Sequence, residues 1–213
     1  MDVVNILENI KNQALIGNTG LPADTDKLVN YLNIAYRGVY DEIARSYPFF
    51  VATTQSVVIT DGQGTLSPAP AYVLSVRDTG NTNQLLYKKD VEAIQADDNR
   101  LDAVGAPSNW YQEGFSTIKT YPVNSTTLSV RYVPNPATLS STSLEAEIMI
   151  PPLYHDVLVW ETLRTVMFDE RDKLLGPENV IIDKRCEEIW GRLNSYLAYH
   201  TAQEPIRTKG VCV

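Results

Sequence analysis

The stretch from Thr25 to Thr60, "TDKLVNYLNIAYRGVYDEIARSYPFFVATTQSVVIT", changes its hydrophobic period partway along. In its first part, apolar residues recur at every third or fourth position, which is the spacing of one face of an α-helix. These residues are Leu28, Leu32, Ala35, Val39 and Ile43. Pro48 ends that pattern, and from Gln55 the period is two, as in a β-strand. The stretch therefore predicts a helix that leads into a β region.

The strand pattern continues for about eighty residues beyond this point. The turn sequences "DGQG" (61–64) and "TGNTN" (79–83) separate short alternating runs, because glycine and asparagine tolerate the backbone of tight turns. In "AYVLSVRD" (71–78) the alternation places Tyr72, Leu74 and Val76 on one face, and in "TTLSVRYVP" (126–134) it does so for Leu128, Val130 and Tyr132. Short strands with polar turns predict a small antiparallel sandwich or barrel.

Helical periodicity occurs at both ends of the chain. Before the β region, Asp2 can cap a helix that Gly17 ends, and after it Pro151 and Pro152 can begin one. The later helices carry apolar stripes: Leu153, Val157, Trp160, Leu163 and Met167, then Ile182, Cys186, Ile189, Leu193 and Tyr196 or Leu197. The predicted fold class is α+β. A helical bundle is formed by residues 1–50 and 140–201, a β domain is inserted at 51–139, and an extended tail follows at 202–213.

Composition narrows the classes of function. The chain has 213 residues and a net charge of −8, without a basic cluster of the kind that grips duplex DNA. No apolar run is long enough for a membrane span, and the N-terminus lacks the pattern of a secretory signal, so we expect synthesis in the cytoplasm and no membrane role. Cys186 and Cys212 are expected to be free thiols.

The sequence shows no constellation of catalytic residues. His155 and His200 are the two histidines, and neither lies in a nucleophile motif such as GxSxG. Adjacent carboxylates such as Asp97 and Asp98 would diverge on a helix rather than converge on a substrate. We therefore expect no enzyme activity, no cofactor and no metal, and we expect both histidines to be structural.

Aromatic residues are the more informative set. Tyrosine occurs twelve times against four phenylalanines, and tyrosine suits surfaces that pack against another protein. Trp110, Tyr111 and Tyr121 are candidate contacts with other subunits or with tail components, although core packing also explains the tryptophan. An alternative is that these three residues form a stacking platform with which the β domain binds a carbohydrate or a peptide.

Three segments carry a resemblance to a known family. They are "LVNYLNIAYRGVYDEIARSYPF" (28–49), "APSNWYQEGFSTIKTYPVNSTTLSVRYVPNPATLS" (106–140) and "IPPLYHDVLVWETLRTVMFDERD" (150–172). The shared features are a tryptophan before a hairpin that ends in Tyr-Pro, a Tyr-x-Pro-x-Pro exit from the next strand, and a proline-led helix. The chain resembles the head-to-tail adaptor proteins of tailed bacteriophages, also called connector or head-completion proteins.

The resemblance implies a structural virion protein. Such adaptors form rings, commonly twelve-fold, between the portal and the tail, where they extend the DNA channel and dock tail or nozzle proteins. DNA would pass through the lumen without specific binding, and an acidic surface is compatible with this because like charges repel. The location implied is the head-to-tail interface of the virion.

The C-terminal tail is the predicted portal-binding segment, since related adaptors often reach the portal with their C-termini. Its residues are Glu204, Pro205, Ile206, Arg207, Thr208, Lys209, Gly210, Val211, Cys212 and Val213. The segment is mildly basic on an acidic chain and ends in apolar residues, which suits an extended strip that lies in a partner's groove.

Overall fold

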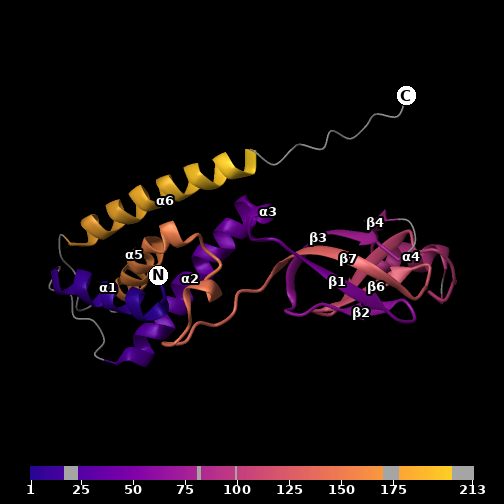
Figure 1. Ribbon diagram of the computed structural model, residues 1–213, viewed down its shortest axis with the longest axis horizontal. Coiled ribbons are helices and arrows are strands. Elements are labelled where there is room, and N and C mark those ends of the chain that lie inside the picture. The colour runs from indigo at the N-terminus through magenta and orange to yellow at the C-terminus, as the bar shows by residue number, and fades with distance from the viewer. Residues whose placement is uncertain (17–23, 81–82, 99, 170–177, 203–213) are drawn as a thin grey trace. The chain divides into compact units, whose positions relative to one another are not determined.

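A computed structural model describes residues 1–16, 24–80, 83–98, 100–169 and 178–202 of the chain (Figure 1). Its contacts divide the chain into two compact units. One unit combines Met1–Phe50 with Pro136–Val213, and the other is the continuous segment Val51–Asn135. They are called the helical unit and the β unit.

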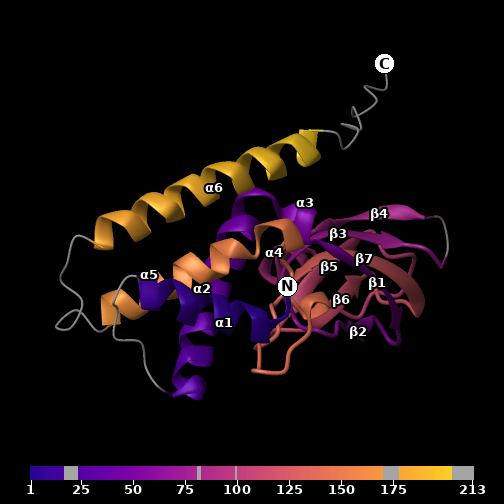
Figure 2. The ribbon, with the colours of Figure 1, turned by 60° about the vertical axis from the view of Figure 1, so that its left-hand side comes forward.

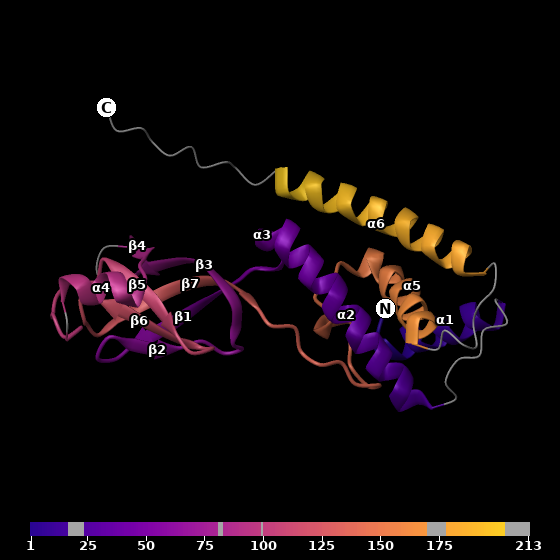
Figure 3. The same ribbon diagram turned by 180° about the vertical axis from the view of Figure 1, so that it is seen from behind.

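The helical unit is built around helix α5 (Asp156–Asp169). This helix packs against α1 (Val3–Ile16), α2 (Thr25–Ser46) and α6 (Glu178–Ala202), so elements from both ends of the chain share one core. The views in Figures 1 and 3 show α6 along one side of α5 and α2 along another. Short turns of 3-10 helix, η1 (Glu145–Glu147) and η2 (Pro152–Tyr154), precede α5, and α3 (Pro48–Val51) follows α2.

The predicted apolar stripes are confirmed in α2 and α6. All five predicted positions of α2 are buried, and in α6 Ile182, Cys186, Ile189, Leu193 and Leu197 are buried while Tyr196 is half-buried. The prediction for Leu153 was wrong, because its side chain is 75% exposed. Pro151 and Pro152 lead into the separate turn η2 rather than into α5 itself, so Leu153 lies outside the helical period.

Polar contacts join the two ends of the chain inside this unit. The Asn33 side chain donates to the carbonyl of Leu139 at 2.9 Å and accepts from its N–H at 2.8 Å. The Tyr36 hydroxyl accepts from the N–H of Met149 at 3.1 Å. These side chains satisfy backbone groups of a segment more than a hundred residues away, which would otherwise be buried without partners.

The β unit contains one seven-stranded sheet and a short helix. The strands are β1 (Thr53–Ile59), β2 (Gln63–Thr65), β3 (Pro70–Asp78), β4 (Gln84–Lys88), β5 (Asn109–Glu113), β6 (Thr117–Tyr121) and β7 (Thr126–Pro134), and the helix is α4 (Val91–Asp97). Their order is β1-β7-β3-β4-β5-β6-β2, and the edge strands β1 and β2 contact each other. The sheet therefore curls into a nearly closed barrel, visible in Figure 2.

Two details of the barrel differ from the prediction. β4 and β5 are parallel, although an antiparallel arrangement was expected throughout. In β3, register shifts flank Tyr72 and Val73, so the alternation breaks: Val76 is fully buried, Val73 packs against the core, and Tyr72 and Leu74 are only half-buried. A β-bulge rotates the strand and changes which residues face inward.

The remaining strand predictions are confirmed. Leu128, Val130 and Tyr132 of β7 all lie in the barrel core. β5 and β6 form the hairpin that ends in Tyr121-Pro122, and it turns at Gly114, whose φ of 65° suits glycine. The chain is thus a mixed α+β protein in which helices from both ends pack together and a barrel is inserted between them in the sequence, as predicted.

Candidate functional site

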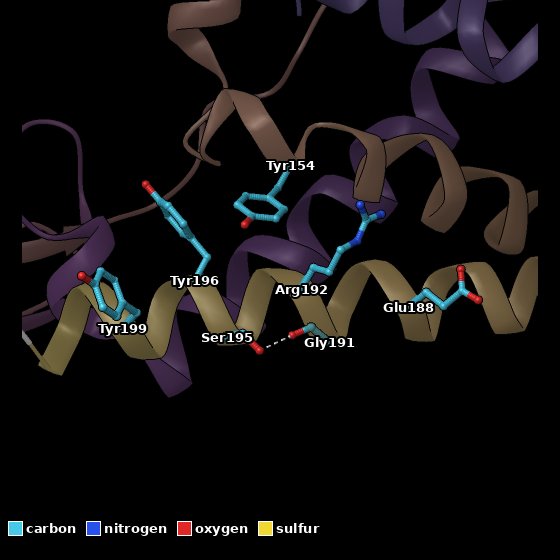
Figure 4. Close-up of a pocket in the computed structure, with 7 residues that line it drawn as sticks. All are labelled: Tyr154, Glu188, Gly191, Arg192, Ser195, Tyr196 and Tyr199. Atoms are coloured by element: carbon cyan, nitrogen blue, oxygen red, sulfur yellow. Dashed lines mark hydrogen bonds between the residues drawn. The ribbon is translucent and has the colours of Figure 1, made fainter.

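An open groove lies along α6, between this helix and η2, and is drawn in Figure 4. Its lining residues come from α6 and from η2: Tyr154, Glu188, Gly191, Arg192, Ser195, Tyr196 and Tyr199. The buried stripe of α6 faces α5, so the residues of the opposite stripe are left at the surface. We call this set the α6 groove.

Aromatic side chains form one wall of the α6 groove. The rings of Tyr154 and Tyr196 lie 5.1 Å apart, and Tyr196 also contacts His200, at 4.2 Å, and Phe50, at 6.2 Å. Tyr199 is 63% exposed. Tyrosine side chains, which combine an apolar ring with a polar hydroxyl, are enriched at protein interfaces.

One residue that lines the groove, Gly191, has no side chain. Gly191 lies in the interior of α6, and a Cβ placed there would meet nothing within 4 Å. The Ser195 hydroxyl donates back to the Gly191 carbonyl at 2.8 Å, so it does not project outward as a free donor. A helix glycine costs about 1 kcal/mol relative to alanine, and no contact with another described residue offsets that cost here.

His155 and Cys186, two side chains of types that often take part in catalysis, are buried. No group of three or more potential metal ligands occurs among the described residues. His155 is fully buried, with Nδ1 2.9 Å from the carbonyl oxygen of Met1 and Nε2 2.9 Å from that of Ile150, which is a structural role. Burial raises the pKa of Cys186 to about 12, so this thiol is no nucleophile at neutral pH.

The three aromatic residues predicted as contacts lie in the β unit. Trp110 and Tyr111 are adjacent on β5 and are only 3% and 7% exposed, and Trp110 belongs to the barrel core. The Tyr121 hydroxyl donates to Asp98 at 3.1 Å, and its side chain is half-buried. A stacking platform needs open ring faces, which Trp110 does not present. Their role as partner contacts stays a prediction.

The predicted portal-binding residues, Glu204 to Val213, lie outside the described residues. The structure instead draws attention to residues that the sequence reasoning missed, above all Gly191, Tyr154 and Tyr199. A signal for Gly191 was present, because a glycine in the interior of a strongly periodic helix needs a packing reason. Tyr154 is far from α6 in the sequence, so its contact with Tyr196 had no local signal.

Comparison with known proteins adds the family. Within the described residues, none of the helices combines the length and apolar character that a bilayer crossing requires. No curated protein matches the sequence. Residues 1–176 match the family described as SU10 adaptor protein, and this range covers α1, α2 and α3 before the barrel, the barrel itself and α5. The chain therefore belongs to the SU10 adaptor protein family, a structural rather than catalytic family of phage head-to-tail adaptors.

Proposed function

We propose that the protein assembles as a homo-oligomeric ring, twelve-fold as in the adaptors it resembles, between the portal and the tail of a phage particle. In this position it extends the DNA channel and docks tail or nozzle proteins. The observation that carries the proposal is the family match over residues 1–176. The protein's location would then be the virion, at the head-to-tail interface.

Surface properties of the helical unit support a role in assembly. The α6 groove offers aromatic and charged side chains on a long, well-packed helix, which is a rigid platform for another protein. The net charge of −8 suits a lumen through which DNA slides, because an acidic wall does not hold phosphates.

The tail supports the portal contact on chemical grounds. Residues 203–213 follow the end of α6 directly and combine Arg207 and Lys209 with an apolar end. An extended, basic and apolar strip can lie in a groove or add a strand to the edge of a partner's sheet.

The test is reconstitution with the cognate portal. Native mass spectrometry and electron microscopy of the mixture should show a ring of adaptor chains on the portal. Deleting residues 203–213 should leave the melting temperature of the isolated chain unchanged and abolish attachment. A full-length chain that neither forms a ring nor binds portal particles would contradict the proposal, whereas a monomer in isolation would not.

A further inference from the structure

Among the described residues, two glycines lie in helix interiors where no neighbouring described side chain requires them. Gly38 in α2 and Gly191 in α6 both have ordinary helical backbone, and a Cβ at either position would meet nothing within 4 Å. Alanine would stabilise both helices and would fit at both positions. A missing side chain on an exposed helix is useful when another backbone must come close. Both glycines therefore point to contacts outside the chain.

Each glycine is the centre of a distinct surface. Around Gly191 lies the α6 groove. Around Gly38 lies a stripe along α2 formed by Ile34, Arg37, Gly38, Asp41 and Arg45, all of them exposed, with Ile34 at 59%. We call it the α2 stripe. Ile34 adds an exposed apolar side chain that the described residues leave uncovered.

The two surfaces are placed as a ring requires. α5 packs against both helices, which lie along different sides of it (Figures 1 and 3). Each helix turns its buried stripe inward, so the exposed residues of α2 and of α6 are on different sides of α5. A cyclic ring joins two different patches head to tail. The helices also run in the same general direction, since Tyr47 and Asn194 near their C-terminal ends are in contact. A neighbour related by a small rotation keeps that direction.

The charges of the two surfaces match in this orientation. Along α6 the order is Glu188, Gly191, Arg192, and along α2 it is Arg37, Gly38, Asp41. Within the chain Glu188 pairs with Arg185 and Asp41 with Arg45, so the contact would share these carboxylates between two arginines. When parallel helices meet at their glycines, Glu188 lies beside Arg37 and Arg192 beside Asp41, because these side chains project to the flanks that then face each other. In the antiparallel orientation, the flank with Glu188 and Arg192 would face the other flank of α2, where Glu188 would meet the exposed Glu42. Charge complementarity therefore selects a second copy in the parallel orientation.

We propose that the α6 groove of one subunit receives the α2 stripe of the next, with Gly191 and Gly38 at the crossing point. This inference rests on the proposed ring and names its subunit interface. Ile34 and the Tyr199 ring cover the two sides of the crossing, and Arg45 comes to lie near Tyr199, where a cation can pack on the aromatic face.

Disulfide trapping tests the crossing directly. In a Cys212→Ser background, Gly38→Cys and Gly191→Cys are combined, the ring is assembled on the cognate portal, and mild oxidation is followed by denaturing electrophoresis. A disulfide forms only when the two Cα atoms come within about 7 Å, which glycine-mediated crossing allows. The expected result is a ladder of linked subunits. Each cysteine alone should give no ladder. The pair of Gly38→Cys with Lys11→Cys, at an exposed position of α1, should also give none.

Two further variants test the chemistry of the contact. Gly191→Trp should reduce ring yield at least tenfold without lowering the melting temperature, because the space above Gly191 is open within the chain; Lys11→Trp is the matched control and should assemble normally. Glu188→Arg should weaken assembly, and adding Arg37→Glu should restore it, since the swap recreates an opposite pair.

The outcomes separate the two proposals. A wild-type ring with no ladder and with normal assembly of Gly191→Trp would overturn this interface and leave the proposed function intact. A wild-type chain that forms no ring on the portal would contradict the proposed function, and an absent ladder in that case would overturn the interface with it.

Discussion

The residues that form the helical unit and those that form the β unit are distributed differently along the sequence. The β unit is one continuous segment, and its core is filled by residues of that segment alone. The helical unit is closed by contacts between distant residues, such as Asn33 with Leu139 and His155 with Met1. The difference teaches that the barrel carries its own folding information, whereas the helical unit exists only when both ends of the chain are present.

The largest expected effect is in the barrel core. Leu128 is fully buried between β1 and β3, so Leu128→Ala should cost about 3 kcal/mol through lost burial and a cavity. Hydrogen exchange at increasing urea concentrations should show that residues 51–135 lose protection at a lower concentration than in the wild type. Protection of the helices should be unchanged. Equal loss of protection in α2 and α6 would show that the two units unfold together and would break the comparison.

A second variant tests the junction that closes the helical unit. Asn33→Leu removes both hydrogen bonds to Leu139 and leaves its N–H and carbonyl buried without partners, at a cost of about 2 kcal/mol. The same exchange experiment should show loss of protection in α2, α5 and α6, with the barrel unchanged. Unaltered helices would mean that water replaces the amide at low cost.

A smaller effect is expected at Tyr36. Its ring is fully buried, burial raises the pKa of its hydroxyl, and that hydroxyl accepts the N–H of Met149. Tyr36→Phe keeps the ring and removes the acceptor, so it should cost about 1 kcal/mol by urea titration. Phe50→Leu, at the edge of the aromatic cluster, serves as a control for ring packing. A loss as large as that of Asn33→Leu would indicate that the hydroxyl does more than hold Met149.

The smallest effect concerns acid stability of the β unit. The Asp98 carboxylate accepts from the N–H of Ala103, which lowers its pKa most, and also from the N–H of Arg100 and the Tyr121 hydroxyl. A lowered pKa in the folded state means that the contribution is present above the usual aspartate pKa and is lost as pH falls through the lowered value.

Asp98→Asn should therefore lower the barrel's urea midpoint slightly at neutral pH, and the difference from wild type should close in acid. Parallel urea titrations of both proteins across the acidic range provide the measurement. A gap that persists unchanged at low pH would assign the effect to geometry rather than to charge.

Much of the fold follows from local pattern. The stripe from Leu28 to Ile43 and the alternation from Leu128 to Tyr132 were readable because each element buries a single face. The parallel pairing of β4 with β5 and the bulge in β3 were not, since both depend on strand order and on contacts between segments. Leu153 was misassigned because a proline-led turn precedes α5.

The candidate site was less predictable than the fold. The family resemblance located the function, and the match over residues 1–176 agrees with it. The α6 groove depends on the contact between Tyr154 and Tyr196, which lie some forty residues apart in the sequence. The hydrophobic periodicity of a sequence does not indicate such contacts. Trp110 was weighed as a contact because its type is common at interfaces, yet its position on an inward face of β5 is set by register.

The division of the helical unit between the two ends of the chain also has a consequence for synthesis. The whole β unit is synthesised before residue 136 is added, and domains generally fold as they emerge from the ribosome. α6 is the last described element to appear, so a growing chain carries the α2 stripe without an α6 groove. Nascent chains on one messenger RNA would be unable to close into rings, and ring closure would await finished, released subunits.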